Sequence, residues 1–218
     1  MVPITEITKD PGGRVVFIQL HHNEKTAVES ALQAIELNGG KFITIENNEE
    51  RNIDFVLDGR KFRFDPNRMF TKNGRMETLK SFKNYSLAAE NELEKFSQFI
   101  LQLVPPSAVV IAIHNNTDHL FSIDDYNKKR KGDADSVHIN ATMDPDDFIF
   151  TTDSSIYRQM VSGNINAVLQ DNTNAYDDGS LSIHLGRSGR SYINVEAEHG
   201  HLEEQSRMIS AVMKIFKD

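Results

Sequence analysis

The sequence predicts an α/β protein in which one mixed sheet carries helices on both of its faces. Two stretches, 15–20 and 108–113, are apolar almost throughout, which is typical of strands that are covered on both sides. Apolar residues at helical spacing follow the first stretch and precede the second, over 25–37 and 86–104. With 218 residues, 39% of them hydrophobic and 26% charged, the chain suits a single three-layer domain over 1–218.

The first apolar strand ends in two imidazoles, an amide and a carboxylate, over 21–24. His21 and Glu24 lie three residues apart, so one tight turn can aim both side chains at a divalent metal ion. A single His-x-x-Glu pattern also occurs by chance in many soluble proteins, so a third ligand has to come from elsewhere in the chain. The helix that follows ends at Asn38 and two glycines, which supply a left-handed stop.

A strand over 41–45 comes next, followed by a hairpin whose strands, 53–57 and 60–64, are separated by an Asp-Gly turn. Directly after the hairpin, a proline ends the strand and leaves Asn67 and Arg68 in a rigid loop. A planar guanidinium in such a loop can hold a carboxylate with two parallel hydrogen bonds. A turn with one surface arginine is the simpler reading of the same residues.

The second apolar strand also ends in a histidine, His114. The long helix before it, 86–104, keeps one apolar face and is ended by two prolines. In open α/β sheets, ligands collect outside the carboxyl ends of the strands. His21, Glu24 and His114 therefore meet if their strands are neighbours in the sheet.

The segment 121–147 is charged and irregular, and we expect it to form a rim or lid. Its basic cluster, 128–131, is followed at once by aspartates, which indicates a solvated loop. A short strand over 148–150 and a helix over 154–161 come next, and a polar loop over 172–179 follows.

The last strand, 191–196, carries a glutamate among apolar residues and precedes a terminal amphipathic helix. A carboxylate in this position needs a metal, a role as a base or a buried partner to offset its desolvation. Glu198 is a rival for the same role, because alternation along the strand puts it on the same side as Glu196.

Composition excludes several classes of protein. The net charge of −8 argues against a nucleic-acid partner, and no stretch approaches the roughly 20 apolar residues of a membrane span. The chain as given is expected to be soluble and cytoplasmic, but a removed targeting segment would leave the same sequence, so an exported location stays open. Zero cysteines mean that any metal has to be held by histidine and carboxylate.

Four ordered motifs resemble the zinc carboxypeptidase superfamily, closest to its succinylglutamate desuccinylase and aspartoacylase branch. The branch carries a His-Gly-Asn-Glu metal turn, an Asp-x-Asn-Arg-x-Phe substrate loop, a third-ligand His-Asn-Thr-like segment and a Val-Glu catalytic strand. The matching segments of this chain are 21–24, 65–70, 113–117 and 194–196. The resemblance covers about 14–205 and implies a phosphorylase/hydrolase-like fold.

The resemblance also implies roles for single residues. His21, Glu24 and His114 correspond to zinc ligands, Glu196 to the general base, and Asn67 and Arg68 to a clamp for a substrate carboxylate. The arginine that stabilises the oxyanion corresponds to Arg60, with Arg63 as the competing assignment, because a hairpin bulge would exchange them.

Two features depart from the branch. His22 replaces the glycine of the metal turn, which we expect to be tolerated if its side chain faces away from the metal. The chain also ends soon after the catalytic strand, without the C-terminal domain that narrows the site in aspartoacylase-like enzymes, so the resemblance alone does not imply their small acyl-amino-acid substrates.

The sequence therefore predicts a zinc-dependent hydrolase that cleaves an amide or peptide bond beside a free carboxylate, either carboxypeptidase-like or an N-acyl amino acid deacylase. The expected partner is a small molecule or peptide that bears that carboxylate. An N-acetylmuramoyl-L-alanine amidase-like cell-wall hydrolase is an alternative, although it does not need the Asn67–Arg68 clamp. A binding module on the same scaffold, without turnover, is the alternative from a different class.

Overall fold

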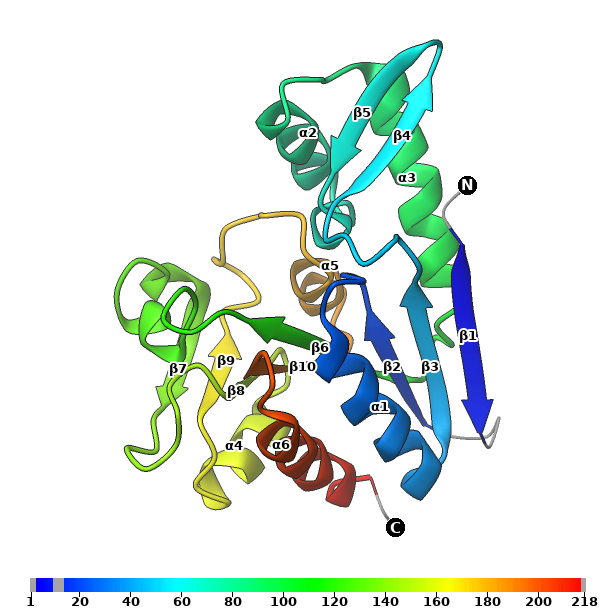
Figure 1. Ribbon diagram of the computed structural model, residues 1–218. Helices are drawn as coiled ribbons and strands as arrows, with labels where there is room; N and C mark the ends of the chain where they lie inside the picture. Colours follow the sequence, from blue (N-terminus) through cyan, green and yellow to red (C-terminus); the bar gives the residue numbers. More distant parts are fainter. Residues whose placement is uncertain (1–2, 10–13, 217–218) are drawn as a thin grey trace.

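The computed structural model describes residues 3–9 and 14–216. One sheet of eight strands forms the centre of the molecule (Figure 1), in the spatial order β1-β3-β2-β6-β10-β8-β9-β7. In chain order its strands are β1 (Ile4–Lys9), β2 (Val15–Gln19), β3 (Gly40–Ile45), β6 (Val109–Asn116), β7 (Ala134–His138), β8 (Phe148–Thr151), β9 (Ala167–Gln170) and β10 (Tyr192–Glu198).

The four strands β3, β2, β6 and β10 are adjacent and parallel. Strands β1 and β8 flank this group and run antiparallel to it, so the sheet is mixed. Because the carboxyl ends of parallel strands meet at one edge of a sheet, the segments that follow β3, β2, β6 and β10 all come together there.

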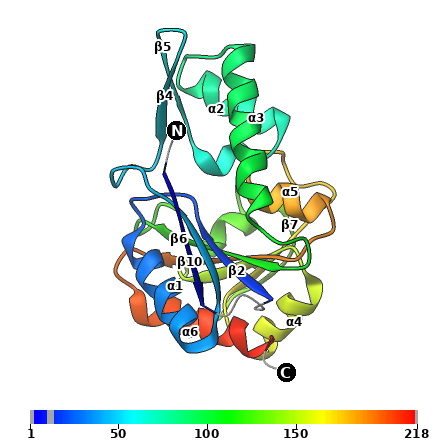
Figure 2. The ribbon, with the colours of Figure 1, turned by 90° about the vertical axis from the view of Figure 1, so that its right-hand side faces the viewer.

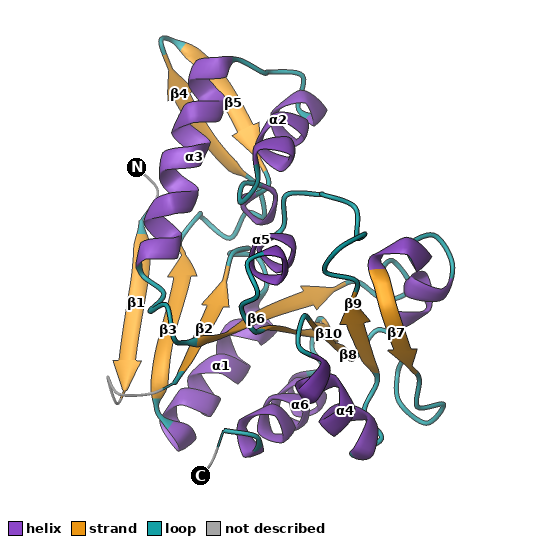
Figure 3. Cartoon of the chain, turned by 180° about the vertical axis from the view of Figure 1, so that it is seen from behind, coloured by secondary structure: helices purple, strands orange, loops and turns teal. Residues whose placement is uncertain are grey.

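Helices cover both faces of the sheet, as Figures 2 and 3 show from two further directions. Side chains on β2 alternate between the two cores: Val16 and Ile18 pack into one, Val15 and Phe17 into the other. The helices are α1 (Lys25–Asn38), α2 (Lys72–Ser81), α3 (Leu87–Gln102), α4 (Ser154–Ser162), α5 (Leu181–Arg187) and α6 (Leu202–Lys214). The predicted α/β class, with a mixed sheet between two helical layers, is confirmed.

A separate hairpin stands beyond the sheet, together with α2 and α3 (Figure 1). It consists of β4 (Ile53–Leu57) and β5 (Arg60–Phe64). Its aromatic side chains stack on one another, and Phe64 meets Phe96 of α3 edge-on. One face of the hairpin is thus buried in the same hydrophobic core as one face of the sheet, and the other faces solvent.

The segment expected as a rim or lid packs against the sheet. It contains two short 3-10 turns, Ile123–Asn127 and Lys131–Asp133, before β7. The rings of Phe121 and Tyr126 contact Phe148 on β8, which anchors the segment. No helix within the described part of the chain is long and apolar enough to cross a membrane.

Several elements were not expected from the sequence: β1, β7, β9, α2 and α5. Strand β1 lies at the edge of the sheet and is half-buried at most, so its residues lack the apolar pattern of a core strand. Helix α2 is mostly polar, and α5 spans only seven residues. Their positions depend on contacts with distant parts of the chain more than on local pattern.

Candidate active site

The sheet brings together the three polar strand ends that the sequence singled out. Strand β6 lies between β2 and β10, and all three are parallel. His114 on β6 is directly level with Glu196 on β10. His21 follows β2 at the same edge, so histidines and carboxylates from segments far apart in the sequence meet at one point.

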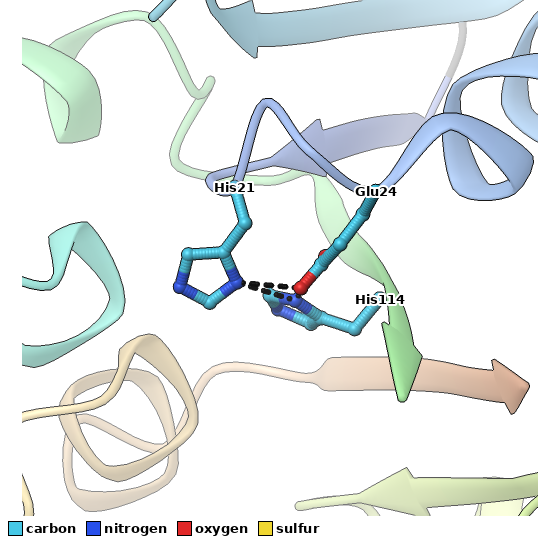
Figure 4. A group of neighbouring side chains, drawn as sticks. All are labelled: His21, Glu24 and His114. Atoms are coloured by element: carbon cyan, nitrogen blue, oxygen red, sulfur yellow. Dashed lines mark hydrogen bonds and ion pairs between the residues drawn. The ribbon is translucent and has the colours of Figure 1, made fainter. Parts of the chain in front are cut away.

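His21, Glu24 and His114 converge there (Figure 4). The Nδ1 atoms of the two histidines are 3.2 Å apart. Each is 2.9 Å from an oxygen of the Glu24 carboxylate. All three side chains are buried, so the cluster is shielded from bulk water.

This donor set fits a zinc ion. Two imidazole nitrogens and a carboxylate are ligands that zinc takes in catalytic sites, and a tetrahedral ion with bonds of about 2.0–2.1 Å to nitrogen places neighbouring ligand atoms about 3.3 Å apart. The 3.2 Å between the two Nδ1 atoms is close to that spacing. The spacing of these two nitrogen atoms is therefore compatible with a zinc ion.

Without a metal, the cluster behaves as a buried ion pair. Burial lowers the pKa of His21, but the carboxylates of Glu24 and Asp65 outweigh it and raise the pKa to about 9. Burial raises the pKa of Glu24, but His21 and His114 outweigh that effect and hold it well below its usual range. Metal binding at the imidazole is then expected to release a proton.

Asp65 and Arg51 contact the converging side chains. The carboxylate of Asp65 lies 2.8 Å from Nε2 of His21, the nitrogen on the far side of the ring. A carboxylate in this position fixes the tautomer and the orientation of a metal-binding histidine. Arg51 donates to Glu24 and to Asp65, each at 3.1 Å, and its guanidinium reaches the cavity beside the metal position.

Two buried glutamines hold the backbone of the site. Nε2 of Gln19 donates to the carbonyl oxygens of His21 and Glu24, at 2.8 and 2.9 Å, and so closes the turn between them. Nε2 of Gln205, on α6, donates to the carbonyl oxygen of His114 at 2.9 Å and to that of Val195 at 3.3 Å. The site is therefore fixed from the helical layer as well as from the sheet.

Glu196 lies in the same cavity as the two histidines and is buried. Nδ2 of Asn194 donates to its carboxylate at 2.9 Å. Burial raises the pKa of Glu196 above its usual 4.5, with His114 acting in the opposite direction. Glu198 is more exposed, and its carboxylate lies 3.7 Å from His201, outside the residues that line this cavity.

The cavity has a volume of about 360 Å³, and Asn67 and Arg68 also line it. Oδ1 of Asn67 accepts a hydrogen bond from the backbone N–H of Leu181. Arg68 Nη1 donates to Asp178 at 2.6 Å. Both predicted clamp residues thus face the same space as the metal cluster.

The structure does not bring Arg60 or Arg63 to this cavity, and the sequence-based assignment of an oxyanion arginine is corrected accordingly. Both side chains are exposed: Arg63 points from the solvent face of the hairpin, and Arg60, at the start of β5, lies over the ring of Phe62. Arg63 forms a two-point ion pair with Asp54, at 2.5 and 2.9 Å, and Arg60 donates to Asn84. The arginine beside the metal position is Arg51.

The remaining histidines lie away from the cluster. His22 faces away from it, as expected, and its Nδ1 accepts hydrogen bonds from the backbone N–H groups of Asn47 and Glu49. His199 borders the cavity. His119, His138 and His184 take no part in its lining.

The sequence reasoning missed Gln19, Arg51 and Asp65. Gln19 carries a signal, since it is a lone amide inside an apolar strand. Arg51 follows the carboxyl end of β3, the strand next to β2, so the rule that ligands collect at strand ends would have included it. Asp65 stands in the substrate loop, but only the folded chain shows that it reaches His21.

No family model matches the chain, and no curated protein matches it. A candidate metallopeptidase from Shewanella baltica OS155 has a similar structure, with a TM-score of 0.47 and 13% identity over 99% of this chain and 80% of its own. N-formylglutamate amidohydrolase from Ralstonia eutropha JMP134 gives 0.43 and 11%, over 99% and 97% of the two chains. The tripeptide-bound cell shape determinant Csd4 from Helicobacter pylori gives 0.43 and 9%, over 98% and 54%. Each of these likenesses is one of fold alone.

Proposed function

We propose that this protein is a zinc-dependent hydrolase that cleaves an amide or peptide bond next to a free carboxylate. One observation carries the proposal. The buried His-Glu-His cluster, the buried carboxylate of Glu196 and the side chains of Arg51 and Arg68 line one cavity. Each is a part that hydrolysis beside a carboxylate requires, and they come from five separate segments of the chain.

In this proposal His21, Glu24 and His114 hold the zinc ion. When bound, zinc supplies Lewis-acid activation of a water molecule near neutral pH and polarises a carbonyl group. Asp65 keeps the His21 ring oriented, and Gln19 keeps His21 and Glu24 on one side of their turn.

Glu196 acts as the general base. Its carboxylate lies beside His114 in the register of the sheet without a hydrogen bond to either histidine, so it is free to accept a proton. Because burial raises its pKa above that of a free carboxylate, it can also return the proton to the leaving amine. Glu198 faces a different group of side chains, which supports Glu196 over its rival.

Arg51 stabilises the negative charge that develops on the carbonyl oxygen. Its guanidinium lies 3.1 Å from Glu24 and borders the cavity, so it would put positive charge beside a carbonyl group bound there. Arg60 and Arg63 are engaged elsewhere and do not serve this role.

Asn67 and Arg68 hold the free carboxylate of the substrate and so set the position of the scissile bond. Oδ1 of Asn67 is occupied by the backbone of Leu181, which leaves its amide N–H groups for the substrate. An amidase-like cell-wall hydrolase does not need this clamp, and a binding module does not need a base beside a metal.

The test measures zinc content and hydrolysis with the purified full chain. We expect one zinc per chain, and hydrolysis of some members of a panel of N-acyl amino acids, peptides and peptidoglycan stem peptides. Amide analogues in which the carboxylate is capped should react poorly. Zinc-loaded protein that hydrolyses none of the panel would contradict the proposal and favour a binding module.

A further inference from the structure

A second group of metal-ligating side chains lies outside the residues that line the cavity. Asp118 and His119 follow the end of β6, and Asp146 comes just before β8. One ligand atom from each of the three residues lies within 4.8 Å of the other two. In the sheet β10 separates β6 from β8, so the fold brings these two loops together from different strands.

Asp146 is the buried member of this group, only 1% exposed. Its Oδ2 accepts a hydrogen bond from the backbone N–H of His119 at 2.7 Å, which turns the carboxylate toward the other two residues. Its Oδ1 is buried and has no hydrogen-bond partner among the described residues. Because a buried carboxylate oxygen is normally paired or bound to a metal, this free oxygen points to a cation.

No basic side chain neutralises the group. Among the residues that the structure describes, neither Asp118 nor Asp146 pairs with a lysine or an arginine, and Asp118 has only the imidazole of His119 beside it. Burial raises the pKa of Asp146, and the carboxylates of Asp144 and Asp118 add to the rise, against the N–H of His119. A divalent cation would offset the repulsion between these carboxylates.

The donor set suits a divalent ion of the manganese type, which takes carboxylate, imidazole and water ligands. An octahedral ion with bonds of about 2.1 Å places neighbouring ligand atoms about 3.0 Å apart. Nδ1 of His119 lies 3.1 Å from Oδ1 of Asp118, close to that spacing. Both of these side chains are more than half exposed, so water can complete the coordination, and we expect weaker binding than at the buried His-Glu-His cluster.

A neighbouring group of Asp144, Glu198 and His201 is equally compact, but it has no such oxygen. The buried carboxylate beside it, Asp147, is paired at both oxygens. Oδ1 accepts from the backbone N–H of Glu198 at 2.9 Å, and Oδ2 lies 3.0 Å from Nδ1 of His201. This second group therefore serves as a matched control for the first.

We propose that Asp118, His119 and Asp146 form a second divalent-metal site, which joins the loop after β6 to the loop before β8. The site is separate from the proposed zinc cluster and does not depend on the proposed function. Its ion would also support one wall of the cavity, because Asn116 lines that wall and donates from Nδ2 to the carbonyl oxygen of Asp146 at 2.7 Å.

Manganese is the probe, because zinc binds the same kinds of ligand more tightly and Mn²⁺ would not displace it from the buried cluster. Full-length protein loaded with one zinc per chain is titrated with manganese chloride, and the free ion is followed by electron paramagnetic resonance. We expect wild type to bind one Mn²⁺ per chain. Asp146→Asn keeps an acceptor for the N–H of His119 but loses the charge, so the affinity should fall at least about 10-fold.

A second variant removes an exposed ligand without a change in the core. His119 has a φ of 60°, which glycine adopts without strain, so His119→Gly should fold and still lose Mn²⁺ binding. Two controls should bind Mn²⁺ as tightly as wild type. His201→Ala changes the neighbouring group, and Asp135→Asn removes an equal charge from an exposed position on β7.

Thermal melting gives a second readout. An ion that joins the two loops should raise the melting temperature of zinc-loaded wild type by roughly 5–10 °C at about 100 times its Kd, and His119→Gly should show no such rise. Wild type that binds no Mn²⁺, or equal binding by wild type, Asp146→Asn and His119→Gly, would overturn the inference. Loss of binding in His201→Ala alone would overturn it too, since the ion would then lie at the neighbouring group.

Discussion

The two ends of the cavity are built from different parts of the fold. At the metal end, His114 and Glu196 lie in adjacent strands, and His21 and Glu24 lie in the turn that follows a third. At the other end, Arg68, Arg130 and Asp178 come from loops and short turns and are partly exposed. The sheet register fixes the first group, and long-range ion pairs and ring contacts position the second.

We expect the two ends of the cavity to have different functions. A rigid, buried end suits chemistry that requires fixed geometry, and a loop-built end suits recognition that varies between relatives of one fold. Changes at the metal end should therefore affect turnover or metal affinity, and changes at the arginine end should affect the choice of substrate. The following predictions test that contrast, from the largest expected effect to the smallest.

The largest effect is expected for Glu196→Gln. Glutamine keeps the shape and can still accept the hydrogen bond from Asn194, but it cannot take a proton, so kcat should fall on the order of 10²- to 10⁴-fold. Zinc content, measured by elemental analysis, should not change. Glu198→Gln is the matched control with a much smaller effect, and the reverse ranking would move the base two residues along β10.

Arg68→Lys should lower kcat/KM for a carboxylate substrate by roughly 10- to 100-fold, because lysine keeps the charge but lacks the planar fork. The zinc affinity should stay the same, which distinguishes the two ends of the cavity. Arg207→Lys, a change at an exposed arginine on α6, is the control. Equal turnover of the carboxylate substrate and its capped amide by wild type would contradict a clamp at Arg68.

Asp65→Asn should weaken zinc binding by about 10- to 100-fold, because an outer carboxylate orients the metal-binding imidazole of His21. Competition with a chromogenic chelator measures this. Asp54→Asn, on the solvent face of the hairpin, should leave the zinc affinity unchanged. An unchanged affinity in Asp65→Asn would mean that the contact with His21 does not orient the metal ligand.

The last effect, similar in free energy to the two before it, concerns stability. Gln19→Leu leaves the carbonyl oxygens of His21 and Glu24 without their buried donor, so the free energy of unfolding should fall by about 1–3 kcal/mol in urea. Gln102→Leu, on the exposed side of α3, should change it by less than about 0.5 kcal/mol. An unchanged free energy of unfolding in Gln19→Leu would show that the turn does not depend on this amide.

Sequence reasoning could predict that His21, Glu24 and His114 meet because the signals are local. The unbroken apolar runs identify buried strands, and the three-residue spacing of His21 and Glu24 places both on one turn. It also predicted that Asn67 and Arg68 lie together after the hairpin, and both do line the cavity.

The arginines show where such reasoning fails. Arg60 and Arg63 were assigned by their distance from Asn67 along the chain, but neither reaches the cavity. Alternation in β5 turns Arg63 to the solvent face, and Arg60, at the exposed start of the strand, lies over Phe62 and donates to Asn84. Arg130 was assigned to solvent by the charge of its neighbours, but it lies across two aromatic rings. In each case the direction of one side chain depends on what packs against its element.

The sequence by itself determined the α/β class, the strand ends that carry histidine or glutamate, and the local metal turn, because each depends on residues within one or two turns of chain. Only the tertiary structure decided that β6 lies between β2 and β10, that Arg51 and Asp65 reach the cluster, and that Arg130 joins Arg68 at Asp178. These contacts join residues many positions apart, and their geometry is set by sheet register and loop packing. Neither leaves a periodic or spacing signal in the chain.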